Sequence, residues 1–392
     1  MADLARRLIR RAVWPESERF RDAKIVVAHE WFTKIGGSDK VAARLAEILE
    51  AEVLFTYALD RELVERLGVE TPVVTWRFGE AAARFGRFPL QLFVMPLVWR
   101  SLDLPAAKQV VTSSHSCVNA VRARGARRTS YVHTPMRYAW DWRLERERLP
   151  RGLRWAMPVA ASALRKFDRR WSRQVDVFVA NSATVRERIE RSYGADAVVV
   201  HPPIEVNFWT PGPSPDRCPA DLPTFAVAGR LVAYKQPDLA VEAAVRAGRD
   251  VVVAGAGPYF GELEAAQIPG VRLVGQPSDI ELREVLRSAD ALLFAGVEDF
   301  GMLPVEAQAC GTPVIARGAG GALETVIDGV TGMFVDGDDV DVWAQAIDSF
   351  VIGQFDPASA RAHAEGFDVA RFDAEILLVF STAPALRNSI TL

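Results

Sequence analysis

Apolar runs of four to eight residues alternate with helix-like segments along most of the chain, and they form two series. The first series predicts strands at 24–31, 53–57, 109–112, 128–132 and 175–180. The second predicts strands at 224–228, 250–254, 271–274, 291–294, 313–316 and 332–335. Strands that alternate with helices are typical of parallel sheets with right-handed crossovers. The pattern therefore predicts an α/β protein with two Rossmann-like domains.

A proline-rich stretch separates the two series and predicts the linker, with HPP at 201–203 and PGPSP at 211–215. We expect an N-terminal domain at 1–210, a C-terminal domain at 211–367, and a last helix in 368–392 that could pack on either domain. A length of 392 residues fits two domains of about 150–200 residues each. Such domains are expected to face a central cleft, with ligands at the carboxyl ends of the strands.

The first 20 residues carry a basic amphipathic pattern. Residues 4–14 read LARRLIRRAVW, which places apolar and arginine side chains on opposite faces of a helix. Such a helix could dock on an anionic membrane surface or pack against its own domain. The sequence leaves both interpretations open.

Composition narrows the class of protein. A hydrophobic fraction of 49% and a charged fraction of 25% are ordinary for a soluble globular chain. Cys117, Cys218 and Cys310 are too few and too far apart for a disulfide framework or a CxxC metal site, which favours a reducing compartment. No run of about 18 apolar residues and no signal-peptide pattern occurs. We expect a cytoplasmic protein, or one bound peripherally to the inner face of the plasma membrane.

The charge is divided unevenly between the two series. Residues 211–392 hold 12 of the 47 basic and 26 of the 50 acidic side chains, so residues 1–210 carry a net charge of +11 and the remainder −14. A basic first half favours anionic lipid headgroups or phosphorylated acceptors. We expect no nucleic-acid partner.

The most informative segment is EDFGMLPVE at 298–306, between an expected strand and an expected helix. The start of a helix offers unpaired amides to phosphate oxygens, and the flanking carboxylates of Glu298 and Glu306 can accept hydrogen bonds from sugar or ribose hydroxyls. A sugar nucleotide fits both features. A second glycine loop, RGAGG at 317–321, could approach the same ligand or could be a structural turn.

Two cations follow the first strand of the second series. Arg230 and Lys235, just after Gly229, can neutralise a leaving diphosphate. The alternative for this pair alone is a solvated surface loop. Further along, Gly255 and Gly257 approach a dinucleotide fingerprint, but Pro258 is poorly placed for phosphate binding, so a tight turn is favoured over a dehydrogenase site.

Candidate residues of the first domain also follow strands. Gly36 and Gly37 could bring backbone close to a ligand, and His133 lies at the same edge as either a structural hydrogen-bonding residue or a catalytic one. His115 has a similar position. Asp141 lies near Tyr138 among aromatic side chains that could stack on a sugar or pack under a loop. No Asp-x-Asp pair or histidine–carboxylate cluster stands out along the chain, so a metal-independent reaction without a cofactor is expected.

Several motifs in this order resemble the retaining glycosyltransferases of family 4, which have the GT-B fold. They are GGSDKV at 36–41, HTPMRYAWD at 133–141, VANSATVRERI at 179–189, GRLVAYKQPDLAVEA at 229–243 and EDFGMLPVEAQACGTPVIA at 298–316. The HTPMRYAWD segment is similar to mannosyltransferases of O-antigen and polysaccharide synthesis. The HPPIEVNFW segment at 201–209 departs from the family, with Glu205 and Asn207 where aspartates are common.

The resemblance implies specific roles. Arg230 and Lys235 would bind the diphosphate, Glu298 the sugar hydroxyls and Glu306 the ribose, while His133 would lie near the anomeric carbon. The other residues implied to bind the nucleotide sugar act through backbone: Gly36, Gly37, Gly229, Val274, Gly275, Gly301, Met302 and Leu303. His115, Tyr138 and Asp141 are the candidates for the acceptor.

The implied reaction is a front-face transfer of a hexose from a nucleoside-diphosphate sugar to a lipid-linked or polysaccharide acceptor. Mannose from GDP-mannose is favoured by the resemblance alone. The alternatives are a UDP-sugar enzyme with a small-molecule acceptor, a sugar-nucleotide epimerase of the same fold, or an inactive partner subunit.

Overall fold

The computed structural model describes residues 2–34, 36–85, 91, 94–142, 154–155, 157–212 and 224–382, with side chains omitted at 2–7 and 382. Cys218 lies outside the described residues. The chain divides into two compact units, one of Met1–Val200 with Asp373–Leu392 and one of His201–Phe372. The boundaries expected from the sequence were residues 210 and 367.

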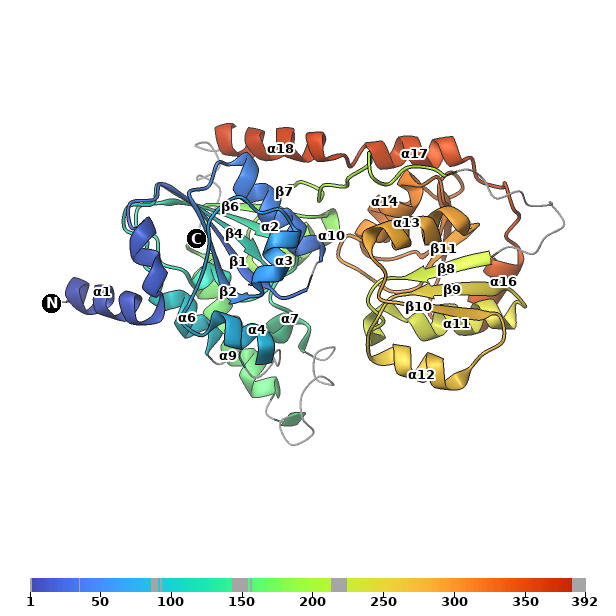
Figure 1. Ribbon diagram of the computed structural model, residues 1–392, viewed down its shortest axis with the longest axis horizontal. Coiled ribbons are helices and arrows are strands. Elements are labelled where there is room, and N and C mark those ends of the chain that lie inside the picture. The colour runs from blue at the N-terminus through green and yellow to red at the C-terminus, as the bar shows by residue number, and fades with distance from the viewer. Residues whose placement is uncertain are drawn as a thin grey trace. The chain divides into compact units, whose positions relative to one another are not determined.

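The first unit contains a seven-stranded sheet in the order β3-β2-β1-β4-β5-β6-β7, with every described pair parallel. Its strands are β1 (Ile25–Phe32), β2 (Val53–Leu59), β3 (Val73–Thr75), β4 (Gln109–Ser114), β5 (Arg127–Val132), β6 (Val177–Ala180) and β7 (Val198–Val199). All five expected strands occur, and β3 and β7 were not predicted. Figure 1 shows helices packed on this sheet.

Up to β7, the helices of the first unit either precede β1, as α1 and η1 do, or lie between strands. They are α1 (Ala2–Val13), η1 (Pro15–Phe20), α2 (Gly37–Ile48), α3 (Arg61–Arg66), α4 (Gly79–Phe85), α6 (Met95–Ser101), η2 (Val118–Ala120), α7 (Arg137–Trp140), α9 (Met157–Ser172) and α10 (Ala183–Tyr193). Alternate residues of β1 and β2, such as Val26, Ala28 and Phe55, join Trp99 of α6 and Trp171 of α9 in one hydrophobic core. The intervening residues face the opposite side of the sheet.

The N-terminal helix α1 ends in contact with its own unit. Trp14, just after it, is fully buried and its Nε1–H donates to the carbonyl of Val98 at 3.1 Å. Arg10 is only 4% exposed; it pairs with Glu18 and donates to the carbonyl of Asp103. Leu8 and Ile9 remain 59% and 53% exposed. The last turn of α1 therefore packs on the unit while two apolar side chains stay in solvent.

The second unit contains a parallel six-stranded sheet in the order β10-β9-β8-β11-β12-β13. Its strands are β8 (Thr224–Ala228), β9 (Asp250–Ala254), β10 (Val271–Gly275), β11 (Ala291–Phe294), β12 (Val314–Arg317) and β13 (Gly332–Val335). In chain order this is the 3-2-1-4-5-6 arrangement of a Rossmann sheet. The prediction of two Rossmann-like domains is confirmed.

Helices cover both faces of the second sheet. They are η5 (Ala233–Lys235), α11 (Pro237–Arg246), α12 (Pro258–Ala266), α13 (Asp279–Ser288), α14 (Met302–Ala309), α15 (Ala322–Thr325), α16 (Val340–Asp348) and α17 (Pro357–Glu365). Leu292 and Phe294 join α13, α14 and α17 in one core. Leu293 joins α11, α12 and α16 in the other. Alternation along the strands therefore builds three layers.

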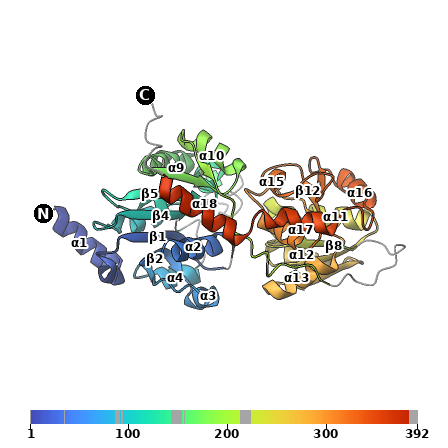
Figure 2. The same ribbon diagram turned by 90° about the horizontal axis from the view of Figure 1, so that it is seen from above.

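The last helix, α18 (Val369–Thr382), begins in the second unit and from Asp373 onward belongs to the first. Asp373 forms an ion pair with Arg44 of α2, and Arg127 of β5 donates to the carbonyls of Val379 and Phe380. Figure 2 shows α18 running over the elements of the first unit. Among the described residues, no helix is long and apolar enough to span a membrane.

Candidate active site

In each sheet the first three strands are added towards one edge and the later strands towards the other edge. The strand order therefore reverses between two adjacent strands, β1 and β4 in the first unit and β8 and β11 in the second. At such a switch point the loops after the two strands diverge and leave room for a ligand at their carboxyl ends. The residues that follow these four strands are therefore where a site is expected.

In the second unit an ion pair bridges the switch point. Lys235, in η5 after β8, places its Nζ 2.7 Å from Oε1 of Glu298, which follows β11. The two side chains are 20% and 19% exposed. Burial alone would lower the pKa of Lys235, but the attraction of Glu298 outweighs it and raises that pKa above its ordinary value. Lys235 is therefore a cation at neutral pH.

Arg230 lies beside this pair and is exposed to solvent. Its Nη2 donates to the hydroxyl of Tyr234 at 3.0 Å. Arg230, Lys235 and Glu298 all line one small pocket, together with apolar residues of β8 and β11. The arrangement offers two positive charges and one carboxylate at the mouth of the switch point. The alternative of a wholly solvated loop does not hold for Lys235, which is four-fifths buried.

Gly296 permits the close approach of the two loops. A Cβ built on Gly296 would lie 2.4 Å from the Cα of Lys235, which no side chain could tolerate. The loop after β11 therefore passes directly against η5. This contact brings Glu298 within reach of the lysine.

The start of α14 presents the backbone amides that the sequence predicted. Gly301 is the N-cap with φ of +86°, a left-handed conformation that favours glycine, so no capping side chain covers the first turn. Because it is the first turn, the amides of Met302 and Leu303 have no acceptor within the helix. Glu306 lies on the same helix and is half-buried. This is the geometry of an anion site at a helix start.

The other expected nucleotide contacts are backbone positions in the same unit. Gly229 follows β8, while Val274 and Gly275 close β10. All three are half-buried. Gly257 is followed at once by α12, which starts at Pro258, so the segment with Gly255 and Gly257 is a turn into a helix.

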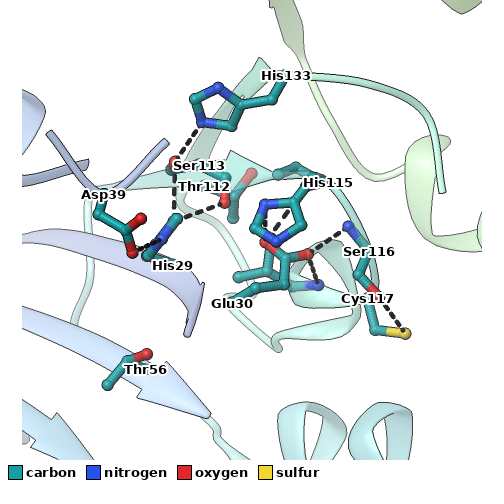
Figure 3. Close-up of polar contacts among 12 residues, drawn as sticks. His29, Glu30, Asp39, Thr56, Thr112, Ser113, His115, Ser116, Cys117 and His133 are labelled. Atoms are coloured by element: carbon teal, nitrogen blue, oxygen red, sulfur yellow. Dashed lines mark hydrogen bonds and ion pairs between the residues drawn. The ribbon is translucent and has the colours of Figure 1, made fainter. Parts of the chain in front are cut away.

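In the first unit a row of polar side chains lies at the switch point between β1 and β4 (Figure 3). His133, after β5, places its Nε2 2.8 Å from the hydroxyl of Ser113 on β4. The same hydroxyl lies 3.0 Å from Nδ1 of His29 on β1, whose Nε2 lies 3.4 Å from Oδ1 of Asp39. Asp39 is in the first turn of α2, two residues after Gly37. The sequence-predicted His133 is therefore tied to three residues that were not predicted.

Glu30 occupies the opposite side of β1 and anchors the loop after β4. Its carboxylate accepts hydrogen bonds from the amides of Ser116 at 2.7 Å, Val118 at 3.0 Å and His115 at 3.3 Å. Burial raises the pKa of Glu30 to about 7, although His29 and the three amides act against the rise. The imidazole Nδ1 of His115 is 3.7 Å from the carboxylate.

Ligand atoms of His29, Glu30 and His115 lie within 4.8 Å of one another, a histidine–carboxylate cluster that the sequence did not reveal. Two of these residues already use their polar atoms: both nitrogens of His29 and both oxygens of Glu30 contact other protein groups. The cluster is thus accounted for by protein contacts, and we assign no metal to it.

Two family models match the chain in succession. One, described as Glycosyltransferase Family 4, matches residues 35–208, and one, described as Glycosyl transferases group 1, matches residues 216–366. The chain belongs to glycosyltransferase family 4. The motifs that carry the resemblance in the sequence lie within these two matches.

Relatives and solved structures agree with this family. The D-inositol 3-phosphate glycosyltransferase of Mycolicibacterium smegmatis is 34% identical over 214 residues, 49% of each chain, and that of Mycobacterium tuberculosis (strain F11) is 33% identical over 199 residues, 45% of this chain and 41% of the relative. The chain thus matches about half the length of these curated relatives.

Two solved structures show the same fold. Anabaena HepE in complex with UDP and glucose is 17% identical with a TM-score of 0.67 over 91% of this chain and 99% of that one. Sucrose-phosphate synthase of Thermosynechococcus elongatus is 16% identical with a TM-score of 0.66 over 91% and 98%. The chain therefore has the GT-B fold of family 4 glycosyltransferases, as predicted.

The residues predicted to bind the acceptor are held by protein contacts. Asp141 forms an ion pair with Arg188, which also donates to the hydroxyl of Thr134 at 3.0 Å. Tyr138 and Trp140 pack against the core of the first unit, and Trp140 donates to the carboxylate of Asp168 at 2.7 Å. Of the two interpretations of these aromatics, packing describes Trp140.

Sequence reasoning missed His29, Asp39 and Ser113. The available signal was the polar pair His29–Glu30 inside the otherwise apolar strand 24–31, where a buried charge requires partners. Asp39 was visible within the GGSDKV motif but carried no role there. Their convergence depends on β1 and β4 being neighbours, which the pattern along the chain does not specify.

Proposed function

We propose that this protein transfers a hexose from a nucleoside-diphosphate sugar to a lipid-linked or polysaccharide acceptor, with retention at the anomeric carbon. The observation that carries the proposal is the Lys235–Glu298 pair beside Arg230 at the switch point of the second unit. Two cations suit a diphosphate, and a carboxylate suits sugar hydroxyls. Family membership supports the same assignment.

The chemical step needs charge stabilisation more than a protein base. As the glycosidic bond breaks, negative charge develops on the diphosphate, where Arg230 and Lys235 stabilise it. Amides at the start of α14 add further hydrogen-bond donors. Glu298 orients the sugar and Glu306 the ribose. The leaving phosphate accepts the proton of the attacking hydroxyl on the same face of the sugar.

Mannose from GDP-mannose is the proposed donor, because the HTPMRYAWD segment resembles polysaccharide mannosyltransferases. A UDP-sugar is the alternative, supported by the HepE complexes with UDP and UDP-glucose. The matched relatives are named for D-inositol 3-phosphate, so a small phosphorylated alcohol is the alternative acceptor.

Ligand-induced stabilisation tests the donor directly. We expect the melting temperature of the purified protein to rise with GDP and GDP-mannose more than with UDP, ADP or their sugars, because a ligand that binds only the folded state stabilises it. A larger rise with UDP and a UDP-sugar would select the alternative donor. No rise with any nucleotide sugar would contradict the proposal.

Product analysis separates transfer from the other functions of this fold. An epimerase would change the sugar nucleotide without an acceptor, and an inactive subunit would leave it unchanged. Incubation with labelled sugar nucleotide and a lipid extract or inositol phosphate should give labelled acceptor. The anomeric configuration of the product, read by NMR, must match that of the donor.

We further propose that the protein binds anionic membranes peripherally, where a lipid-linked acceptor would be. Leu8 and Ile9 of α1 are exposed, and α9 exposes Val159 and Phe167, at 75% and 53%. The exposed face of α9 also carries Lys166 and Arg170, and its one carboxylate, Asp168, is buried. Apolar side chains among cations are the composition of a helix that lies on an anionic surface.

A further inference from the structure

A row of four polar side chains runs from the interior of the first unit to the half-buried His133 (Figure 3). The three inner members, Asp39, His29 and Ser113, are 4%, 0% and 0% exposed. Their contacts, 3.4, 3.0 and 2.8 Å long in that order, are continuous from the Asp39 carboxylate to Nε2 of His133. Because water is kept from the inner members, each proton in the row must be shared between neighbouring side chains.

We propose that Asp39 is a positioning residue that sets the tautomer of His133 through the two side chains between them. The role that this gives to His133, as a hydrogen-bond acceptor for a hydroxyl of the transferred sugar, rests on the proposed function. Neither the tautomer of His133 nor its control by the Asp39 carboxylate, three contacts away along the row, requires a bound ligand.

The donor and the acceptor of each hydrogen bond in the row follow from the protonation state of Asp39. An ionised Asp39 can only accept, so Nε2–H of His29 donates to it. Nδ1 of His29 is then a lone pair, which accepts the hydroxyl proton of Ser113 at 3.0 Å. The backbone carbonyl of Ser113, 3.3 Å from the same nitrogen, would accept from Nδ1 only in the state with the extra proton. The Ser113 oxygen in turn accepts from His133, so the proton of that ring is on Nε2. Nδ1 of His133 is left as an acceptor.

A second proton on the Asp39–His29 pair would reverse every step. His29 would then donate from Nδ1 towards Ser113, the serine hydroxyl would donate to Nε2 of His133, and the His133 proton would move to Nδ1. The row therefore has two states that differ by one proton, and the state of the inner pair determines whether His133 accepts or donates at its outer nitrogen.

The contacts of Asp39 favour the state in which His133 accepts, and the lowered pKa of His133 makes its ring neutral in either state. Asp39 accepts hydrogen bonds from its own amide and from that of Gly36 as well as from His29, contacts that favour the carboxylate and act against the rise in its pKa that burial causes. Burial lowers the pKa of His133 to about 3, so this ring stays neutral near pH 7 and its tautomer is well defined. Figure 3 shows the second ring nitrogen of His133 on the side away from Ser113.

Histidine-ring NMR of the full-length protein tests the proposal without a ligand. Two-bond proton–nitrogen correlations distinguish a protonated ring nitrogen from a lone-pair nitrogen, and the chain has five histidines, so loss of one signal set in His133→Ala assigns it. We expect wild-type His133 to be protonated on Nε2 near pH 7. A wild-type ring protonated on Nδ1 would overturn the proposal outright.

Variants test the control by Asp39. In Asp39→Asn the side-chain amide can either donate to His29 or accept from it. The hydrogen bonds of the row can then run in both directions, and His133 should show mixed tautomers. Ser113→Ala cuts the row and should have the same effect, and Asp39→Asn should then add nothing in the Ser113→Ala background. Unchanged His133 signals in both single variants would contradict the inference. If Asp39→Asn fails to fold, Ser113→Ala alone decides.

A matched control is the neighbouring residue on the same strand. Thr112 also makes a buried hydroxyl contact, 2.6 Å to Asn119, on the opposite face of β4. Thr112→Val removes that hydrogen bond and should leave the tautomer of His133 unchanged. A shift of equal size in Thr112→Val would show that the spectra report general loosening of the sheet rather than the row.

Calorimetric titration supplies the functional readout. Loss of one hydrogen bond to the sugar should weaken binding of the nucleotide sugar by about fivefold to tenfold in Asp39→Asn, and leave binding of the nucleoside diphosphate alone unchanged. Equal weakening of both ligands would indicate a purely structural role for Asp39. If the wild type binds no nucleotide sugar, the proposed function fails, whereas the NMR result still tests the row.

Discussion

Nζ of Lys235 lies 2.7 Å from Oε1 of Glu298, and this pair joins the loops after β8 and β11 across the switch point of the second unit. Each residue limits the freedom of the other before any ligand binds. The lysine is held charged by the carboxylate, and the carboxylate is held beside the pocket by the lysine. A ligand with a diphosphate would compete with Glu298 for the lysine and release the carboxylate for hydroxyl groups.

Removing either cation should slow the reaction strongly. Arg230→Ala and Lys235→Ala are each expected to lower kcat by roughly 10²-fold or more, the scale of a lost transition-state charge contact. Steady-state rates of sugar transfer measure this. Arg246→Ala is the control, because Arg246 of α11 lies in exposed ion pairs with Glu242 and Asp341. Near-normal turnover in both site variants would refute the assigned roles.

The Lys235–Glu298 pair should also give the protein a stability that depends on pH at the alkaline end. The folded pKa of Lys235 is raised above its ordinary value of 10.5. Such a group contributes stability that is fully present below pH 10.5 and is lost as pH rises through the folded pKa. Denaturant unfolding at pH 9 and pH 11 should show a larger loss for the wild type than for Glu298→Gln. An identical loss in both proteins would exclude the pair as its source.

Glu30 should produce a dependence of the same sign at a lower pH, because its pKa is also raised in the folded protein. Its folded pKa of about 7 exceeds the ordinary value of 4.5, so the folded state binds more protons between these values. The contribution of Glu30 to stability therefore falls as pH rises from about 4.5 to 7, and it is constant outside that window. As pH rises across this window, the wild type should therefore lose unfolding free energy relative to Glu30→Gln, as measured by urea unfolding. A flat difference would mean that Glu30 titrates normally.

Membrane binding should depend on α1 and α9 together. Pelleting with anionic vesicles is expected to weaken in Ile9→Glu and Phe167→Glu, and most in the double variant. Each substitution removes apolar area that would enter the membrane and adds a negative charge that the anionic lipids repel. Binding should also fall with added salt. Ile280→Glu in α13 is the control, since Ile280 is 60% exposed in the second unit. Equal pelleting of all variants would remove both helices from the proposed surface.

The fold was largely predictable because buried parallel strands are continuous apolar runs. Each strand of the second sheet was predicted to within one residue at either end. In the first sheet β3 and β7 were not predicted, because runs of three and two residues have no distinctive pattern. The helical pattern at 4–14 was also correct. It nevertheless placed Arg10 with the solvated arginines, whereas Arg10 is buried against Glu18.

The sequence allowed individual site residues to be placed at the ends of strands, but it did not reveal which of their side chains contact one another. Lys235 and Glu298 could each be placed after a strand, yet their ion pair requires β8 to lie beside β11, which periodicity does not encode. His133 could likewise be placed at a strand end, but His29 was hidden within an apolar run and Asp39 within a helix start. Strand order, rather than any local motif, brings these side chains together.

Strand β1 gives its two polar residues opposite tasks. His29 faces Asp39 and Ser113, while Glu30, the next residue, faces the amides of the loop after β4. Inserting or deleting one residue within β1 would exchange these faces, so that the imidazole would meet the loop amides and the carboxylate would meet the serine. This strand should therefore tolerate changes of apolar side chain far better than the insertion or deletion of a single residue, because only an even change of length keeps each side chain on its own face.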